Sequence, residues 1–209
     1  MSTVRVKICG ITTPDDGVMA AAAGADAIGL VFWPKSSRFV EYERAAEIHR
    51  ALPPFVLRVG VFVDASRDEL ERAIAAGGLD MVQLHGQEPP ERMGEPTRRV
   101  LKALRVGPGF QPEQALAYEG RVAGLLLDTQ SSAAPGGTGE TFDWSLAAAL
   151  RPRVSHLVLA GGLTAGNVGR AIAVVRPDAV DVSSGVESAP GRKDPTKVQA
   201  FIQAVRSAA

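Results

Sequence analysis

Short apolar runs recur along the whole chain and alternate with amphipathic, charged segments. The runs are rich in Val, Leu, Ile and Ala and cover residues 4–9, 27–32, 56–63, 81–85, 99–104, 124–128, 156–160 and 179–183. Short apolar runs predict buried strands, and the periodic segments between them predict helices. This alternation favours parallel strands that are joined by right-handed helical crossovers.

The number of strand–helix units indicates the architecture. Eight such units in 209 residues predict an α/β fold, a single (β/α)8 TIM barrel with eight parallel strands, formed as one domain by residues 1–209. Residues 89–94 and 111–118 are the weakest helix signals. A doubly wound open sheet is the alternative, but the chain lacks a glycine-rich dinucleotide turn after a strand, which makes that fold less favoured.

The same residue types recur just before the predicted strands and helices. Asp26, Asp80 and Asp178 each stand just before a predicted strand, so they would lie at the N-terminal ends of the strands, where a barrel is stabilised rather than catalytically active. We therefore interpret these aspartates as structural. Thr13, Ser66 and Asp194 each have the sequence context of a helix N-cap, so we assign them to capping.

Composition narrows the range of partners. The chain has 23 basic and 23 acidic residues and a formal net charge of +0, which gives no indication of a nucleic-acid partner. We find no secretory signal and no apolar stretch long enough to span a bilayer, so we expect a cytoplasmic protein with no membrane partner. The three histidines are widely spaced, and no cofactor motif is present; we therefore expect no metal and no cofactor.

Cys9 is the single cysteine and ends the first predicted strand. Val4, Val6 and Ile8 form one apolar set that suits the helix-facing side. Arg5, Lys7 and Cys9 then point into the barrel, with Cys9 at the carboxyl end of the strand, where barrels of this kind hold their active sites. A free cysteine is often a small core residue, so the pattern leaves both a core role and a chemical role open.

Other polar residues lie at or near the carboxyl ends of predicted strands. Asp128 ends the sixth run, Asp181 lies within the eighth, and His85 ends the fourth with the same parity as Gln83. Together with Cys9, a carboxyl group at this end of the barrel forms a possible pair of acid and base. We treat His85 as a candidate substrate-binding residue.

Three loops are rich in glycine. Segments 160–168 and 183–188 follow the seventh and eighth runs, where barrels commonly bind a phosphate through backbone N–H groups. Segment 131–144 is long and follows Asp128, so it is a candidate lid, although a disordered insertion has the same composition. The candidate lid glycines are Gly136, Gly137 and Gly139.

The motifs VKICGIT, PKSSRFV, GVFVD, VQLHG, LLLDT, GGTGETFDW, LAGGL and DVSSGVE follow one another along nearly the whole chain. In this order and spacing the sequence resembles the phosphoribosylanthranilate isomerase family. The resemblance implies an Amadori rearrangement of N-(5-phosphoribosyl)anthranilate to 1-(2-carboxyphenylamino)-1-deoxyribulose 5-phosphate in tryptophan biosynthesis. Little of it extends to residues 89–120.

The resemblance also implies roles for residues of this chain. Cys9 would be the general base and Asp128 the general acid. Arg38 would face the anthranilate carboxylate, and Asp181 would lie near the substrate's amino group. The residues expected to hold the phosphate are Gly161, Gly162, Ser184 and Gly185.

General chemistry agrees with these roles. Ring opening needs a protonated acid, and the Schiff base that forms acidifies the C2 proton, so the substrate is its own electron sink and no cofactor is needed. A thiolate base requires a lowered pKa; Lys7 either lowers the pKa of Cys9 or neutralises a carboxylate inside the barrel.

Two other functions remain as alternatives. The first is an isomerase of histidine biosynthesis, or a bifunctional enzyme, although those typically have an aspartate in place of Cys9. The second is a barrel that only binds a sugar phosphate. We expect a phosphorylated small-molecule substrate and either a monomer or a homodimer.

Overall fold

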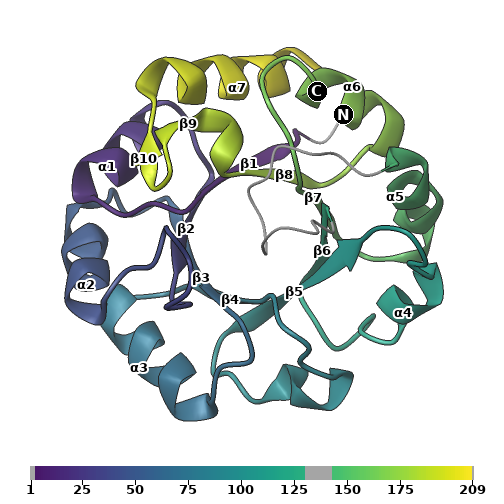
Figure 1. Cartoon of the computed structure of the whole chain (residues 1–209), viewed down its shortest axis with the longest axis horizontal. Coiled ribbons are helices and arrows are strands. Elements are labelled where there is room, and N and C mark those ends of the chain that lie inside the picture. Colours follow the sequence, from purple (N-terminus) through teal and green to yellow (C-terminus); the bar gives the residue numbers. More distant parts are fainter. Residues whose placement is uncertain (1–2, 130–142, 209) are drawn as a thin grey trace.

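The strands form a closed parallel barrel in the computed structural model, which describes residues 3–129 and 143–208. Each strand pairs with its neighbours in chain order, and β8 closes the barrel on β1 (Figure 1). All eight predicted strands are present, so the prediction of a (β/α)8 TIM barrel is confirmed and the open sheet is excluded. The strands are β1 Arg5–Cys9, β2 Ala27–Val31, β3 Leu57–Phe62, β4 Met81–Leu84, β5 Arg99–Val106, β6 Gly124–Thr129, β7 Leu157–Leu159 and β8 Ala179–Val182.

Helices surround the barrel (Figure 1). The α-helices are α1 Pro14–Ala22, α2 Tyr42–Ala51, α3 Arg67–Gly77, α4 Pro112–Leu116, α5 Trp144–Leu150, α6 Val168–Val175 and α7 Pro195–Ala208. Short 3₁₀ segments are η1 Pro90–Gly94, η2 Arg151–Arg153 and η3 Ser184–Val186. Both weak helix signals remain short, as η1 and α4. No described helix is long and apolar enough to cross a membrane.

The expected helix caps are present. The Thr13 side chain accepts a hydrogen bond from the Asp16 N–H, and Ser66 forms a capping box with Glu69. Asp194 accepts from the Lys197 N–H at the start of α7. These side chains satisfy N–H groups that have no partner within the first turn of a helix.

A two-stranded hairpin after β8 was not predicted. Strand β9 (Glu187–Ala189) pairs antiparallel with β10 (Arg192–Lys193). Both strands are very short, and the charged residues in them gave no alternating pattern that would have indicated a hairpin.

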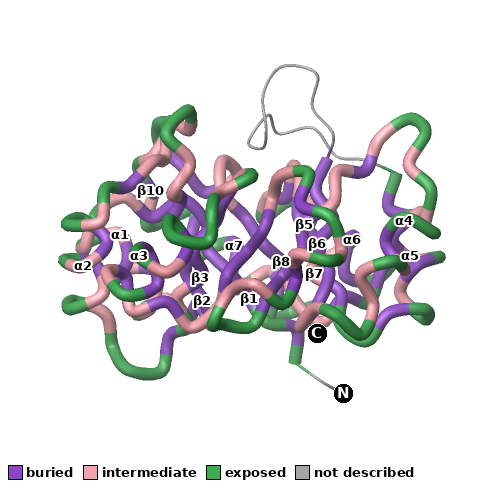
Figure 2. The backbone as a smooth tube through the Cα atoms, turned by 90° about the horizontal axis from the view of Figure 1, so that it is seen from below, coloured by how far each residue is buried: buried purple, intermediate pink, exposed green. Residues whose placement is uncertain are grey.

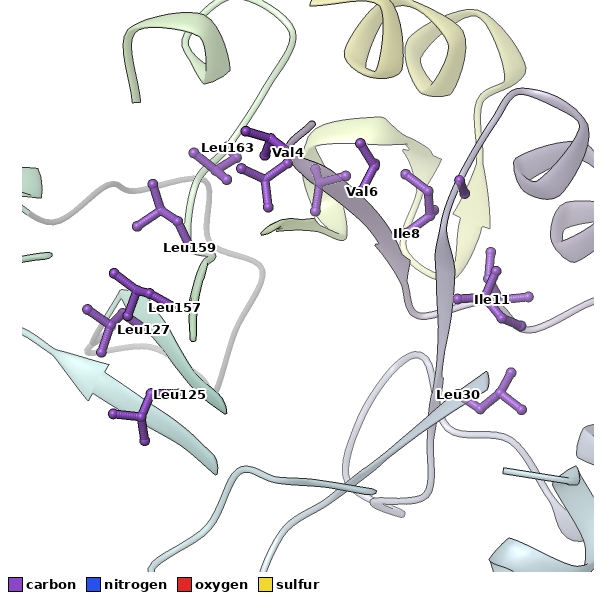
Figure 3. Close-up of a cluster of buried hydrophobic side chains, with 14 of the residues drawn as sticks. Val4, Val6, Ile8, Ile11, Leu30, Leu125, Leu127, Leu157, Leu159 and Leu163 are labelled. Atoms are coloured by element: carbon purple, nitrogen blue, oxygen red, sulfur yellow. The ribbon is translucent and has the colours of Figure 1, made fainter. Parts of the chain in front are cut away.

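The hydrophobic core lies mainly between the strands and the helices. Val6 and Ile8 are fully buried and point from β1 toward the surrounding helices rather than into the barrel (Figure 3). The strands are almost entirely buried, and the exposed segments lie around them (Figure 2). A smaller set inside the barrel comprises Leu101, Ala103, Leu126 and Ala160. This separation confirms the predicted parity of β1 and leaves Lys7 and Cys9 on the inner face.

The three aspartates that precede strands act in one way. Asp26, Asp80 and Asp178 stand before β2, β4 and β8. Each carboxylate accepts a backbone N–H at the start of the preceding strand, at 2.8 Å; the donors are Val6, Arg58 and Leu157. Each also pairs with at least one arginine. The repeated aspartates therefore join neighbouring strands at the N-terminal end of the barrel, as the structural interpretation predicted.

The Asp80 carboxylate allows a stability test. Burial opposes its ionisation, but hydrogen bonds from the Arg58 side chain and backbone outweigh this and hold the pKa of Asp80 below its usual value. We expect Asp80→Asn to lower the free energy of unfolding by about 1 kcal/mol at pH 7, a modest value because the pair is partly exposed.

The effect of pH on this variant has a definite sign. A carboxylate whose folded-state pKa is lowered contributes stability above its unfolded-state pKa of about 3.9 and loses it as the pH falls through the folded-state value. Urea denaturation should therefore show a full difference between wild type and Asp80→Asn at pH 7 and a shrinking one below about pH 4. A difference that grows in acid would contradict this role.

Candidate active site

One pocket lies at the carboxyl ends of the strands and is lined from opposite sides of the barrel. It holds about 780 Å³ of space that is continuous with solvent. The predicted site residues that line it are Cys9, Arg38, His85, Asp128, Gly161, Gly162, Asp181, Ser184 and Gly185. Every predicted site residue in the described part of the chain is thus brought to one place.

Cys9 ends β1 and is 9% exposed at the bottom of the pocket. Its register partner on β2 is Gly29. A Cβ atom at position 29 would lie 2.6 Å from the Cys9 Sγ, much closer than atoms approach without bonding. Glycine at this position of β2 therefore provides the space that the thiol occupies.

Burial and nearby charges have opposing effects on the pKa of Cys9. Burial raises the pKa of the thiol, the charge of Lys7 lowers it, and Asp181 raises it again, so the net pKa is above its usual value. Lys7 does favour the thiolate, as one sequence hypothesis held. The lowered pKa that a preformed thiolate base would need is, however, not what this site provides.

Lys7 also fulfils the alternative role of neutralising a carboxylate. Its Nζ lies 2.9 Å from the Asp181 Oδ2, and both side chains are buried inside the barrel between β1 and β8. The other carboxylate oxygen, Oδ1, is buried without a hydrogen-bond partner among the described residues. Since a buried acceptor without a partner is costly, this oxygen is suited to accept an N–H from a ligand.

Asp128 is the penultimate residue of β6, across the barrel from Cys9. Its Oδ1 accepts the Thr129 N–H at 2.9 Å, and its Oδ2 lies 3.3 Å from the His85 Nε2. The Nδ1 of His85 lies 3.1 Å from the Gln83 Nε2. One oxygen of Asp128 is thus fixed by the backbone, and the other shares the pocket with His85.

Arg38 lies in the loop after β2 and lines the pocket. Its Nε and Nη2 donate to the two oxygens of Glu187, at 2.8 and 2.7 Å. These hydrogen bonds raise the pKa of Arg38 further, so it is a permanent cation. The guanidinium is therefore held in place by a carboxylate from the β9–β10 hairpin.

The loops after β7 and β8 supply the glycines that were predicted to hold a phosphate. Gly161 and Gly162 are both left-handed, with φ of 84° and 63°. A Cβ at Gly161 would lie 2.5 Å from the Thr129 N and 2.9 Å from the Asp128 Oδ1. No hydrogen bond among the described residues uses the N–H of Gly161 or Gly162, so both are available to an anion.

Some pocket residues were missed by the sequence analysis. Ser183 lines the pocket, and its Oγ is buried without a hydrogen-bond partner in the described ranges. Gly29 and Glu187 shape the pocket through Cys9 and Arg38. Glu187 and Ser183 belong to the DVSSGVE motif, so the motif itself was a signal, whereas nothing in the sequence distinguishes Gly29 from other strand glycines.

Two further predictions concern a lid and a metal site. The candidate lid glycines Gly136, Gly137 and Gly139 lie outside the described residues. Among the described residues, no group of three or more His, Cys, Asp or Glu side chains is placed to hold a metal ion.

Barrels of this architecture carry their active sites at the carboxyl ends of the strands. Fold and pocket together therefore define a (β/α)8-barrel enzyme.

Comparison with known proteins gives the particular family. The family model described as N-(5'-phosphoribosyl)anthranilate (PRA) isomerase matches residues 6–204. The chain is 56% identical over 208 residues to the N-(5'-phosphoribosyl)anthranilate isomerase of Pseudomonas aeruginosa (strain UCBPP-PA14), covering 99% of this chain and 97% of the relative. The chain belongs to the N-(5'-phosphoribosyl)anthranilate isomerase family.

Solved structures agree with this assignment. The phosphoribosyl anthranilate isomerase of Thermotoga maritima is similar with a TM-score of 0.91 and 46% identity, covering 98% of this chain and all of that one. A phosphoribosyl anthranilate isomerase in complex with reduced 1-(o-carboxyphenylamino)-1-deoxyribulose 5-phosphate is similar with a TM-score of 0.88 and 44% identity, over 98% of this chain and 100% of that chain. The family resemblance of the sequence motifs is therefore confirmed.

Alkylation tests the charge state of the thiol. Because burial raises the pKa of Cys9, we expect iodoacetamide labelling without substrate to have its midpoint above the ordinary thiol pKa of about 8.5. Mass spectrometry at a series of pH values would measure it. Cys9→Ser is the control, since the chain has one cysteine. A midpoint below the ordinary value would contradict the effect of burial.

Proposed function

We propose that this chain catalyses the Amadori rearrangement of N-(5'-phosphoribosyl)anthranilate to 1-(2-carboxyphenylamino)-1-deoxyribulose 5-phosphate, the isomerase step of tryptophan biosynthesis. The observation that carries the proposal is that a thiol, a carboxyl group, a fixed guanidinium and two glycine loops line one pocket, in a chain of this family. Each of them suits one part of this substrate.

Asp128 acts first, as the general acid. It delivers a proton to the furanose oxygen as the C1–O bond breaks, and the lone pair of the anilino nitrogen forms the C1=N bond of a protonated Schiff base. The Thr129 N–H fixes one carboxyl oxygen, and the other, which faces His85 in the pocket, carries the proton. A positioned acid of this kind contributes about 10²–10⁴-fold to a rate.

Cys9 acts second, as the general base. The thiol loses its proton to the medium, and the thiolate removes the C2 proton; the C2–H electrons form the C1=C2 bond, and the C=N electrons return to nitrogen. The enolamine then loses its hydroxyl proton and takes a proton at C1, which gives the ketone. The raised pKa of Cys9 is compatible with this order, because the Schiff-base cation adds a positive charge that favours the thiolate when it is needed.

The remaining groups bind the two ends of the substrate. Arg38 receives the anthranilate carboxylate, because a guanidinium can pair with a carboxylate through two N–H groups. Asp181 receives the anilino N–H on its Oδ1, which has no hydrogen-bond partner among the described residues. The phosphate lies on the loops after β7 and β8, with Gly161, Gly162, Ser184 and Gly185 as its expected partners.

Other properties of the chain follow from this proposal. The chain acts as one barrel domain over residues 1–209, supported by a family match that spans residues 6–204. It works in the cytoplasm, where Cys9 stays reduced. It acts on a phosphorylated small molecule as a monomer or a homodimer; a structural relative from Thermotoga maritima is described as dimeric, with monomers generated from it, and sedimentation would decide the state here.

A fluorescence assay tests the function itself. The purified chain should consume freshly made N-(5'-phosphoribosyl)anthranilate, followed by the change in anthranilate fluorescence. The corresponding aminoaldose substrate of histidine biosynthesis is the control. Turnover of that substrate alone, or tight binding without any turnover, would contradict the proposal.

Substitution of the acid or the base should abolish most of the activity. We expect Cys9→Ala and Asp128→Asn each to lower kcat by about 10²–10⁴-fold, the usual contribution of one positioned acid or base. Affinity for the reduced product analogue should stay near that of wild type, because the phosphate and carboxylate contacts remain. Near-normal turnover of Cys9→Ala would place the base elsewhere in the pocket, with Asp181 and His85 the first candidates.

Substitution of Arg38 should affect binding more than chemistry. The anthranilate carboxylate is remote from the bonds that break, so Arg38→Ala should raise KM while kcat changes little. Steady-state kinetics would separate the two constants. A collapsed kcat with an unchanged KM would refute the assignment of Arg38 to the carboxylate.

A further inference from the structure

Glu187 lies at the centre of a buried group of three charges beside the pocket. It begins the β9–β10 hairpin and is 8% exposed. Its carboxylate accepts Arg38 Nε and Nη2 at 2.8 and 2.7 Å and Lys193 Nζ at 2.8 Å. Burial opposes the ionisation of Glu187, but the Arg38 hydrogen bonds and the charge of Lys193 outweigh it and lower its pKa. Glu187 is therefore an anion between two cations.

This arrangement fixes which edge of Arg38 is free. Nε and Nη2 face Glu187, whereas Nη1 has no hydrogen bond to any described residue. The stem is confined as well, because a Cβ on Gly10 would lie 2.5 Å from the Arg38 Cδ. A guanidinium that is held along one edge presents Nη1 and the second Nη2 hydrogen as a fork along the other edge, which matches a carboxylate.

The charge count of the group points the same way. The other buried pairs near this end of the barrel, Lys7–Asp181 and Lys102–Glu88, each balance one cation with one anion. The group of Arg38, Glu187 and Lys193 has two cations and one anion. Because the negative charge of Glu187 is shared between Lys193 and Arg38, the positive charge of Arg38 is only partly neutralised. An anionic ligand in the pocket would neutralise the rest.

We propose that Glu187, supported by Lys193, is the positioning residue that sets the selectivity of the pocket for a substrate bearing an aryl carboxylate. Glu187 holds the free edge of Arg38 toward the ligand. Lys193 pairs with Glu187 as well and so prevents Glu187 from fully neutralising Arg38. This inference rests on the proposed function, since it assigns the carboxylate of that substrate to Arg38.

Two ligands isolate the effect. One is the reduced product analogue, 1-(2-carboxyphenylamino)-1-deoxyribitol 5-phosphate, and the other is its phenylamino counterpart without the carboxylate. The ratio of their dissociation constants measures the selectivity for the carboxylate, and their shared phosphate cancels in it. Wild type should prefer the carboxylate form, and Arg38→Ala should bring the ratio near one.

Glu187→Gln keeps the shape of the side chain but removes its charge and one acceptor. We expect it to reduce the selectivity ratio by about tenfold, the worth of one charged hydrogen bond to the ligand, because Arg38 no longer holds its free edge toward the carboxylate. This loss outweighs the removal of one neutralising charge, and KM should rise more than kcat falls. Glu187→Asp should restore part of the ratio. Asp80→Asn is the matched control, because Asp80 also binds both Nε and Nη2 of an arginine, but at the opposite end of the barrel; it should leave the ratio unchanged.

Lys193→Met provides a second test if Glu187→Gln does not fold. Without Lys193, Glu187 balances Arg38 alone, so the ratio should fall although Arg38 stays in place. A wild-type ratio in folded Glu187→Gln or Lys193→Met, with Arg38→Ala near one, would overturn the inference and leave the proposed function intact. Wild type without turnover or without preference for the carboxylate would instead contradict the proposed function.

Discussion

The need to balance buried charges governs the carboxyl end of this barrel. Lys7, Asp181, Lys102, Glu88, Glu187 and Lys193 are all at most 8% exposed. An unpaired charge at such positions would cost several kcal/mol, so each is paired within 2.9 Å or less. The pair of Lys7 and Asp181 joins β1 to β8, 174 residues apart in the chain, and Asp181 lines the pocket. The other two pairs join residues that are 14 and 6 apart in the chain.

These buried ion pairs affect the charge state of Cys9 and the place where the pocket can bind an anion. The pair of Lys7 and Asp181 is neutral as a whole, so it gives Cys9 little net charge, and burial raises the pKa of the thiol. In the proposed mechanism the thiolate is therefore favoured only when the Schiff-base cation forms next to it. The group around Glu187 is not neutral, and that is where the site is suited to a permanent anion of the substrate.

Much of the fold could be predicted from the sequence, because its signals are local. Eight short apolar runs gave eight strands, and the parity of residues 4–9 placed Cys9 inside the barrel. Asp128, Asp181 and His85 could be assigned to the pocket because they lie at or near the carboxyl ends of strands, which all meet at one end of a closed parallel barrel. The particular roles of Asp128 and Asp181 came from the family resemblance and remain proposals.

What could not be predicted depends on contacts between distant segments. Gly29 matters because Cys9 is its register partner across β1 and β2, and Glu187 matters because its hairpin folds back onto Arg38, 149 residues away in the chain. The pKa of Cys9 could not be predicted either, since the sequence shows a nearby lysine but not the depth of burial or the carboxylate that offsets it.

In the proposed mechanism, Asp128 and Cys9 divide the reaction between ring opening and removal of the C2 proton. The most direct measurement is the deuterium isotope effect on single turnover with substrate deuterated at C2, compared between Cys9→Ala and Asp128→Asn. We expect a primary isotope effect in Cys9→Ala, where removal of the C2 proton limits the rate, and none in Asp128→Asn, where ring opening limits it. An isotope effect in Asp128→Asn and none in Cys9→Ala would contradict the division.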